Sequence, residues 1–314
     1  MLRLLSMESA ASSSVHPETT REFTGWRFHY PFASHYLAQP AGRMHYVDEG
    51  RGEPILMVHG NPSWSFLYRQ VIQSLRPLFR CVAPDHIGCG LSDKPQNFSY
   101  RLKDHIDHLE NLMTTLDLQN ITLMVHDWGG AIGMGAALRQ PDRIKRIIAM
   151  NTAAFPSTRI PFRIAVCRWP ILGPLAVRGG NLFARAALRM AVANPDHMSP
   201  TIAQGFLHPY NSWANRVAIQ RFVEDIPIPD EHPTYPLIKQ IGEGLRRFAD
   251  RPVMLAWGLQ DFCFSAHFLT EWKTRFPEAE VHAYSDAGHY LLEEKAEVLV
   301  PLMRNFILRS SGKG

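Results

Sequence analysis

Three polar residues, Asp127, Asp261 and His289, are the ones whose types and order in the chain point most directly to chemistry. Each lies just past an apolar run of the kind that forms a buried strand. Asp127 also precedes a helical pattern that begins at Ala131, and a sharp turn between strand and helix presents its side chain for attack. Because a carboxylate is already ionised at neutral pH, Asp127 needs no base to displace a leaving group from an sp³ carbon and form an ester.

His289 and Asp261 are the residues predicted to finish such a reaction. Water must attack the ester on Asp127, and that water needs a base. We expect His289 to take the proton from water and Asp261 to fix the tautomer of the imidazole and stabilise its cation. Taken singly, each residue also fits an ordinary structural role: a helix cap for Asp127, a turn residue for Asp261 and a loop histidine for His289. Asn151 follows an apolar run too, but it is uncharged, so Asp261 is preferred as the acid.

Two residues with side-chain N–H groups, Asn61 and Trp128, flank Asp127 in this scheme. Asn61 follows the apolar run 54–59, and Trp128 comes directly after Asp127. Their backbone N–H groups are predicted to hold the oxyanion that forms during ester hydrolysis. The amide of Asn61 and the indole of Trp128 would also cradle a departing halide. Taken singly, Asn61 also fits a turn before Pro62, and Trp128 also fits core packing.

The apolar runs before these residues alternate with helical patterns along most of the chain. Buried strands are predicted at 54–59, 80–84, 121–125, 144–151, 252–257 and 281–284, and helices at 66–75, 102–116, 131–139, 266–276 and 291–308. Such alternation predicts an α/β fold with a mostly parallel sheet flanked by helices. Because function collects at the carboxyl ends of parallel strands, the polar residues should meet at one edge of the sheet. An antiparallel hairpin, 35–38 with 43–47, should come first.

Residues 155–228 break this rhythm and are predicted to form an inserted helical cap on a core of residues 23–154 and 229–314. Prolines recur there, and helical runs such as 184–193 occur without a clear buried strand. Eight arginines and no lysine lie between residues 155 and 224, which indicates a solvated face or a contact with a partner protein or an acidic surface. The candidates for the lining of a slot under the cap are Phe162, Trp169, Phe183, Leu188, Phe206 and Trp213, and several of these are expected to be core residues of the cap instead.

Composition excludes several other classes of function. The 314-residue chain is 46% hydrophobic and 20% charged, as expected of a globular protein with a sizeable core. A net charge of +4 without a dense Lys/Arg run argues against binding to nucleic acid. The four cysteines form no Cys-x-x-Cys pair, so no metal is predicted, and scattered thiols suit a reducing cytoplasm. Residues 1–22 are predicted to be a disordered extension, and no apolar run is long enough to span a membrane.

Together these motifs resemble the haloalkane dehalogenases of the α/β-hydrolase superfamily. The matching stretches are 59–62 (His-Gly-Asn-Pro), 85–93, 126–130 (His-Asp-Trp-Gly-Gly), the Asp261 loop and Gly288-His289, and the resemblance covers about residues 25–308. A triad of Asp, His and Asp with an Asn and Trp halide pair is similar to the third subfamily. That subfamily contains or borders on the β-lactone decarboxylases of bacterial long-chain olefin synthesis. The stretches 151–156 and 211–216 resemble that second group as well.

The resemblance implies two reactions that both start from Asp127. The first is hydrolytic dehalogenation of a haloalkane to an alcohol and a halide ion, through an ester on Asp127 and without a cofactor. The alternative is decarboxylation of a β-lactone to a long-chain olefin by the same aspartate. Members of this subfamily tend to be poor dehalogenases and to form oligomers, so we expect a homo-oligomer.

Other hypotheses fit the residues less well. An epoxide hydrolase would share the aspartate but usually needs two tyrosines in the cap, whereas residues 155–228 contain only Tyr210, and Asn61 replaces an expected aromatic residue. A fluoroacetate dehalogenase has an arginine beside the nucleophile, where Trp128 stands here. From a different class, a non-catalytic binding or scaffold protein of this fold is disfavoured by the intact triad.

Overall fold

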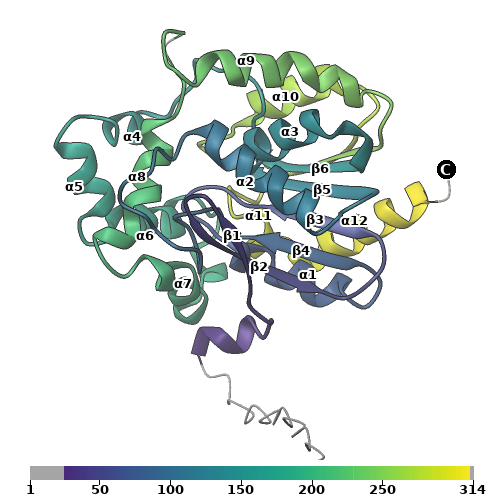
Figure 1. Ribbon diagram of the computed structural model, residues 1–314, viewed down its shortest axis with the longest axis horizontal. Coiled ribbons are helices and arrows are strands. Elements are labelled where there is room, and N and C mark those ends of the chain that lie inside the picture. Colours follow the sequence, from purple (N-terminus) through teal and green to yellow (C-terminus); the bar gives the residue numbers. More distant parts are fainter. Residues whose placement is uncertain (1–24, 229, 312–314) are drawn as a thin grey trace, which may run out of the picture.

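A computed structural model describes residues 25–228 and 230–311, and an eight-stranded sheet forms its centre (Figure 1). The strands are β1 (His35–Gln39), β2 (Gly42–Glu49), β3 (Pro54–Val58), β4 (Arg80–Pro84), β5 (Ile121–Asp127), β6 (Ile144–Thr152), β7 (Val253–Gly258) and β8 (Glu280–Tyr284). Their order across the sheet is β1-β2-β4-β3-β5-β6-β7-β8. β2 pairs antiparallel with β1 and β4, and the remaining pairs are parallel, so the predicted mostly parallel sheet is confirmed.

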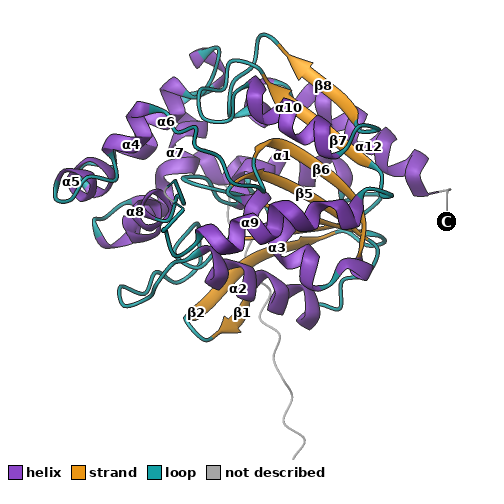
Figure 2. Ribbon diagram, turned by 90° about the horizontal axis from the view of Figure 1, so that it is seen from above, coloured by secondary structure: helices purple, strands orange, loops and turns teal. Residues whose placement is uncertain are grey.

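The central strands are apolar along most of their length because helices cover both faces of the sheet (Figure 2). Every residue of β3, β5 and β7 is buried. One face packs against α1 (Arg69–Leu75) and α12 (Ala296–Ser311), and the other against α2 (Leu102–Thr115), α3 (Gly129–Arg139), α9 (Tyr235–Gly244) and α10 (Ala266–Arg275). A strand that is covered on both faces has no solvated side, which explains the continuous hydrophobic runs in the sequence.

We call residues 155–228 the cap segment. Its helices are α4 (Phe162–Val166), α5 (Leu172–Arg178), α6 (Leu182–Met190), α7 (Pro200–Leu207) and α8 (Val217–Glu224). All residues of this segment are described, and none of them is in a strand. In both ribbon views the five helices gather on one side of the molecule, beside the sheet (Figures 1 and 2).

Two elements differ from the predicted ones. The sequence did not point to α9, because Pro236, Gly242 and Gly244 weaken its helical pattern. The predicted closing helix 291–308 is two helices, α11 (Leu291–Glu294) and α12, separated at Lys295, whose φ of −134° is not helical. The predicted extension of residues 1–22 lies outside the described residues. None of the helices that the structure describes is long and apolar enough to cross a bilayer.

Candidate active site

Asp127 ends β5 and stands in the turn before α3, where its backbone φ is +54°. A left-handed φ is uncommon for a residue other than glycine and marks a strained turn. Gly129 makes the turn possible, since a Cβ there would lie 2.0 Å from the Val58 backbone oxygen. Val125 occupies the position two before Asp127, where glycine is usual. Its bulk fits because Gly133 of α3 leaves space: a Cβ at Gly133 would lie 2.7 Å from Val125 Cγ1.

His289 connects Asp127 with Asp261. Its Nδ1 lies 2.8 Å from Asp261 Oδ2, and its Nε2 lies 3.7 Å from Asp127 Oδ2. All three side chains are buried. Asp261 follows β7 and His289 follows β8, so two neighbouring strands deliver the pair to the end of β5. The structure therefore brings together the three residues that were predicted to react.

Four hydrogen bonds surround the carboxylate of Asp261. Oδ1 accepts from the backbone N–H groups of Cys263 (2.7 Å) and Phe264 (3.0 Å). Oδ2 accepts from Asn151 Nδ2 (2.9 Å) and faces His289 Nδ1. Burial alone would raise the pKa of Asp261, but the charge of His289 and these hydrogen bonds outweigh burial and lower the pKa. Asp261 is therefore held as an anion, which is the form that can stabilise a histidine cation.

Burial and charge act in opposite directions on Asp127 and His289. Burial raises the pKa of Asp127, and the charge of His289 and the neighbouring backbone N–H groups offset this only in part. Burial alone would lower the pKa of His289, but the charges of Asp261 and Asp127 and the hydrogen bond to Asp261 outweigh it and raise the pKa. The two carboxyl groups therefore stabilise the cation that His289 forms when it takes a proton.

The backbone N–H groups of Asn61 and Trp128 both donate to the carboxylate of Asp127. Asn61 N lies 2.6 Å from Asp127 Oδ1, and the Trp128 backbone N–H is a second donor to the same side chain. If Asp127 forms an ester through Oδ2, Oδ1 becomes the carbonyl oxygen, and Asn61 N–H already points at it. Such preorganised donors are what an oxyanion hole requires.

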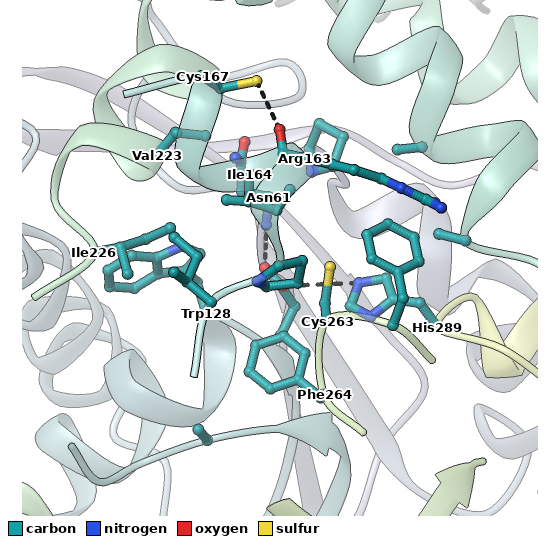
Figure 3. A pocket seen from close by; sticks show the side chains of 18 of the residues that line it. Asn61, Trp128, Arg163, Ile164, Cys167, Val223, Ile226, Cys263, Phe264 and His289 are labelled. Atoms are coloured by element: carbon teal, nitrogen blue, oxygen red, sulfur yellow. Dashed lines mark hydrogen bonds and ion pairs between the residues drawn. The ribbon is translucent and has the colours of Figure 1, made fainter. Parts of the chain in front are cut away.

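The side chains of Asn61 and Trp128 both line the cavity above Asp127, but their N–H groups are not equally free (Figure 3). Among the described residues nothing accepts a hydrogen bond from the Trp128 indole. Asn61 Nδ2 donates to the Ile219 backbone oxygen (3.2 Å) in α8, and Asn61 Oδ1 is buried with no partner in the described part of the chain. One of the two N–H groups of this amide is therefore engaged by α8, and the second has no acceptor in the described part of the chain.

An apolar cavity of about 410 Å³ joins these residues to the cap segment (Figure 3). Its lining includes Asn61, Asp127, Trp128 and His289. The rest is mainly hydrophobic and includes Leu102, Phe155, Ile160, Ile164, Phe183, Val223, Ile226, Ile238 and Phe264. The arrangement places one carboxylate and a few donors against a pocket suited to a hydrocarbon substrate.

The predicted slot lining is mostly wrong. Of the six residues expected there, Phe183 lines the cavity. Leu188 and Phe206 are buried in the hydrophobic core, and Phe162, Trp169 and Trp213 are exposed. The helices of the cap segment are short, and several of them show apolar side chains to the outside, so hydrophobicity alone did not tell which face points inward.

Glu294 of α11, to which the sequence did not point, joins the His289 loop to the cap segment. Its Oε1 accepts two backbone N–H groups of the loop 191–194, at 2.8 and 2.9 Å, and its Oε2 accepts from Gly288 N–H at 2.7 Å. The backbone N–H of His289 donates to an oxygen of the same loop at 2.7 Å. Glu294 is buried. One carboxylate therefore joins the residue before His289 to the loop 191–194 of the cap segment.

Two further polar side chains support the site from β6 and β5. Asn151 donates through Nδ2 to the Gly258 oxygen (3.0 Å) and accepts from Gly258 N–H (2.9 Å), which orients its amide toward Asp261. His126 Nε2 lies 2.8 Å from the His289 backbone oxygen. Burial and the nearby charge of His289 lower the pKa of His126 to about 3, so this ring stays neutral. The position of Asn151 at the end of a strand was a usable signal for its role.

Groups that other reactions require are placed elsewhere. Tyr210, the single tyrosine of the cap segment, is buried outside the cavity and donates to the Ser63 backbone oxygen (3.0 Å). In the described ranges, no three His, Cys, Asp or Glu side chains are grouped so that they could hold a metal ion. The donor set around Asp127 therefore consists of N–H groups and His289.

Comparisons with known proteins agree with this fold. The family model described as the alpha/beta hydrolase fold matches residues 53–296. A protein of Shewanella oneidensis named cis-3-alkyl-4-alkyloxetan-2-one decarboxylase is 46% identical over 88% of this chain and 89% of its own length. Haloalkane dehalogenase 2 of Mycobacterium tuberculosis is 32% identical over 84% of this chain and 91% of its own. The crystal structure of haloalkane dehalogenase DatA from Agrobacterium tumefaciens superposes with a TM-score of 0.80 at 26% identity, covering 88% of this chain and 97% of that one.

Proposed function

The chain belongs to the α/β-hydrolase fold family, with oxetanone decarboxylases and haloalkane dehalogenases among its relatives, and on that premise we propose that Asp127 opens a cis-3,4-dialkyl-oxetan-2-one and releases an alkene and carbon dioxide. The observation that carries this proposal is the 46% identity over 88% of the chain to a decarboxylase named for that substrate. The apolar cavity supports it, because such a β-lactone is hydrocarbon apart from its four-membered ring.

The proposed reaction has two steps and uses no water. Asp127 Oδ2 attacks ring carbon 4, and the bond from carbon 4 to the ring oxygen breaks, so that the oxygen leaves as part of a carboxylate on carbon 3. The bond from carbon 3 to that carboxylate then breaks, and its electron pair forms the double bond between carbons 3 and 4. The bond from carbon 4 to Asp127 returns its electron pair to the aspartate. Carbon dioxide and the alkene leave, and Asp127 is regenerated.

The surrounding residues have proposed roles in that sequence. The backbone N–H of Asn61 holds Asp127 Oδ1, so that Oδ2 is the attacking oxygen, and the Trp128 backbone N–H is a second donor to this carboxylate. The Trp128 indole N–H donates to the carboxylate that develops as the ring opens. His289 stands beside Asp127 and can stabilise the same carboxylate when it is protonated, a form that the neighbouring carboxylates favour by raising its pKa, and Asp261 fixes the orientation of that ring.

Hydrolytic dehalogenation is the second proposed function, and one observation favours it. His289 stands 3.7 Å from Asp127 and is hydrogen-bonded to Asp261, which is the arrangement of a base that activates water. Decarboxylation, as written above, has no step for such a base. A haloalkane would be attacked by Asp127 in the same way. Trp128 would hold the halide together with the second N–H of the Asn61 amide.

Two substrates in parallel test the assignment. A long-chain cis-β-lactone is followed by alkene, and a brominated alkane by bromide release. We expect fast alkene release and slow bromide release, and Asp127→Asn should remove both. Fast bromide release without alkene would assign the protein as a dehalogenase.

His289→Gln separates the two reactions further. With the bromoalkane we expect about one bromide per protein molecule and an alkylated Asp127 that is visible by mass spectrometry, because hydrolysis of the ester loses its base and slows by about 10²–10⁴-fold. With the lactone we expect repeated turnover, since the ester collapses without water. Equal arrest of both reactions would contradict the proposed route.

The state of the protein in the cell is also proposed from its relatives. We propose a cytoplasmic homo-oligomer in which residues 155–228 act as a cap over the substrate and a halide ion binds at Trp128 in the dehalogenation reaction. Light scattering on the purified protein measures the mass of the particle. A mass equal to one 35.7 kDa chain would contradict the oligomer.

A further inference from the structure

The outer side of the cap segment exposes an unusual number of large apolar side chains. We call this surface the cap face and define it by Phe162, Trp169, Ile171, Leu172, Leu175, Leu182 and Met190, with the exposed arginines Arg159, Arg163, Arg185 and Arg189. Phe162 is 77% exposed and Ile171 is 76% exposed. α4, α5 and α6 lie at the edge of the molecule away from the strands (Figures 1 and 2). Clustered exposed hydrophobic residues mark a contact surface.

The charge of this surface has one sign. Residues 155–195 contain six arginines and no aspartate, glutamate or lysine. None of these six arginines has an ion-pair partner among the described residues. An ordinary solvated helix mixes charges of both signs. Here guanidinium groups alternate with hydrophobic side chains, which is the composition of a helix that lies on an anionic membrane surface.

Helix α6 shows the pattern most clearly. Its exposed residues are Leu182, Arg185, Ala186, Arg189 and Met190, which are spaced by three or four along the helix and form one face. The opposite face, with Ala184 and Leu188, is buried. One apolar side of the helix therefore packs against the protein. A second side, which carries both apolar residues and arginines, is exposed.

The cap face is continuous with the active-site cavity. Leu182, Ala186 and Met190 of α6 are exposed and also line the cavity. From α4, Arg163 and Ile164 line it as well (Figure 3). The same side chains therefore meet the outside and the cavity that ends at Asp127. An apolar molecule held against this face would therefore lie beside residues that line the cavity.

We propose that the cap face docks on an anionic lipid bilayer and that the enzyme draws its substrate from that bilayer. Two copies of this chain would not pair through this face, because their arginines would be opposed with no acidic residue to neutralise them. An anionic bilayer can bind both the arginines and the apolar side chains of this face. Arginine contacts lipid phosphates, while Trp169 and the aliphatic side chains enter the interface. Docking on the bilayer is independent of the proposed reaction. The origin of the substrate in the bilayer does rest on the proposed function.

Vesicle binding without substrate tests the docking. The full-length protein is sedimented with vesicles of phosphatidylcholine alone or of phosphatidylcholine mixed with phosphatidylglycerol. We expect binding to the mixed vesicles that weakens as salt rises, and little binding to phosphatidylcholine. Arg185→Gln and Arg189→Gln should each weaken the affinity about fivefold, the factor that corresponds to about 1 kcal/mol per arginine near an anionic surface. Ile171→Ser should weaken it as well.

Matched variants elsewhere on the surface serve as controls. Val298→Ser, at a residue that is 54% exposed in α12, and Arg246→Gln should leave vesicle binding unchanged. Asp127→Asn should also bind vesicles like the wild type, so the docking proposal is tested separately from the proposed reaction. No binding to mixed vesicles at low salt would overturn the proposal. A self-association that Ile171→Ser abolishes would overturn it too, because the face would then join two copies.

Discussion

Replacing Glu294 by glutamine should weaken both folding and catalysis, because this carboxylate ties the His289 loop to the cap segment. Oε1 of Glu294 accepts from the backbone of Ala193 and Asn194, and Oε2 accepts from Gly288. Glutamine keeps one acceptor oxygen and turns an NH₂ group toward the donors on the other side. At least one buried N–H then loses its acceptor and faces another donor.

The expected loss of stability follows from the number of bonds. A hydrogen bond to a charged acceptor contributes about 2 kcal/mol and one to a neutral acceptor about 1 kcal/mol. Three charged bonds in the wild type become two neutral bonds in Glu294→Gln, so the free energy of unfolding should fall by about 4 kcal/mol. Because the backbone of His289 is released on one side, kcat should fall by about 10²-fold, as for a catalytic group displaced by about 1 Å.

Urea unfolding followed by tryptophan fluorescence measures the first effect, and steady-state alkene or bromide release measures the second. Glu297→Gln is the matched control, since Glu297 lies three residues further along and is exposed. A free energy of unfolding within about 0.5 kcal/mol of the wild type, the range of ordinary surface substitutions, would refute the proposed role of Glu294. A loss of stability with unchanged kcat would show that Glu294 holds the fold but not the histidine.

Other substitutions test the electrostatics of the site. Asn151→Ala removes a hydrogen-bond donor from Asp261, so the pKa of Asp261 should rise. We expect kcat to fall about tenfold, the low end for a lost charge-assisted hydrogen bond. A pH–rate profile should show that, on acidification, the variant loses activity at a higher pH than the wild type. Asp127→Asn should stabilise the fold at neutral pH, because burial raises the pKa of Asp127 and its charged form is unfavourable there. That gain should vanish below the ordinary pKa of an aspartate, where the wild-type carboxyl is protonated both folded and unfolded, and urea unfolding at the two pH values measures it. Trp128→Phe keeps a ring against α8 and removes the indole donor, so kcat/KM for bromide release should fall about 10²-fold.

The candidate catalytic residues could be predicted because local patterns place them. Asp127, Asp261 and His289 each follow a hydrophobic run, and parallel strands deliver their carboxyl ends to one edge of the sheet. Asn61 and Trp128 were found by the same rule, since both stand at strand ends beside Asp127. What the sequence did not show is that the amide of Asn61 is engaged by α8, because that contact joins residues 158 positions apart.

The residues that were missed depend on contacts between distant segments. Glu294 meets its partners in the loop 191–194 across about a hundred residues of chain, and nothing near Glu294 in the sequence marks it. Asn151 was considered only as an acid, although an amide can serve the same carboxylate by donating to it. The prediction of the residues that line the slot was mostly wrong for another reason. Phe162 and Trp169 are apolar and exposed, so the usual rule that apolar faces point inward does not apply on the cap face.

The pairing of Val125 with Gly133 limits the order in which the turn at Asp127 can change during evolution. A Cβ at position 133 would lie 2.7 Å from Val125 Cγ1, so any side chain there is excluded while the valine remains. A descendant could gain a residue at position 133 only after position 125 had become smaller. While valine stands at position 125, glycine is therefore the residue that fits position 133 without a shift of its neighbours.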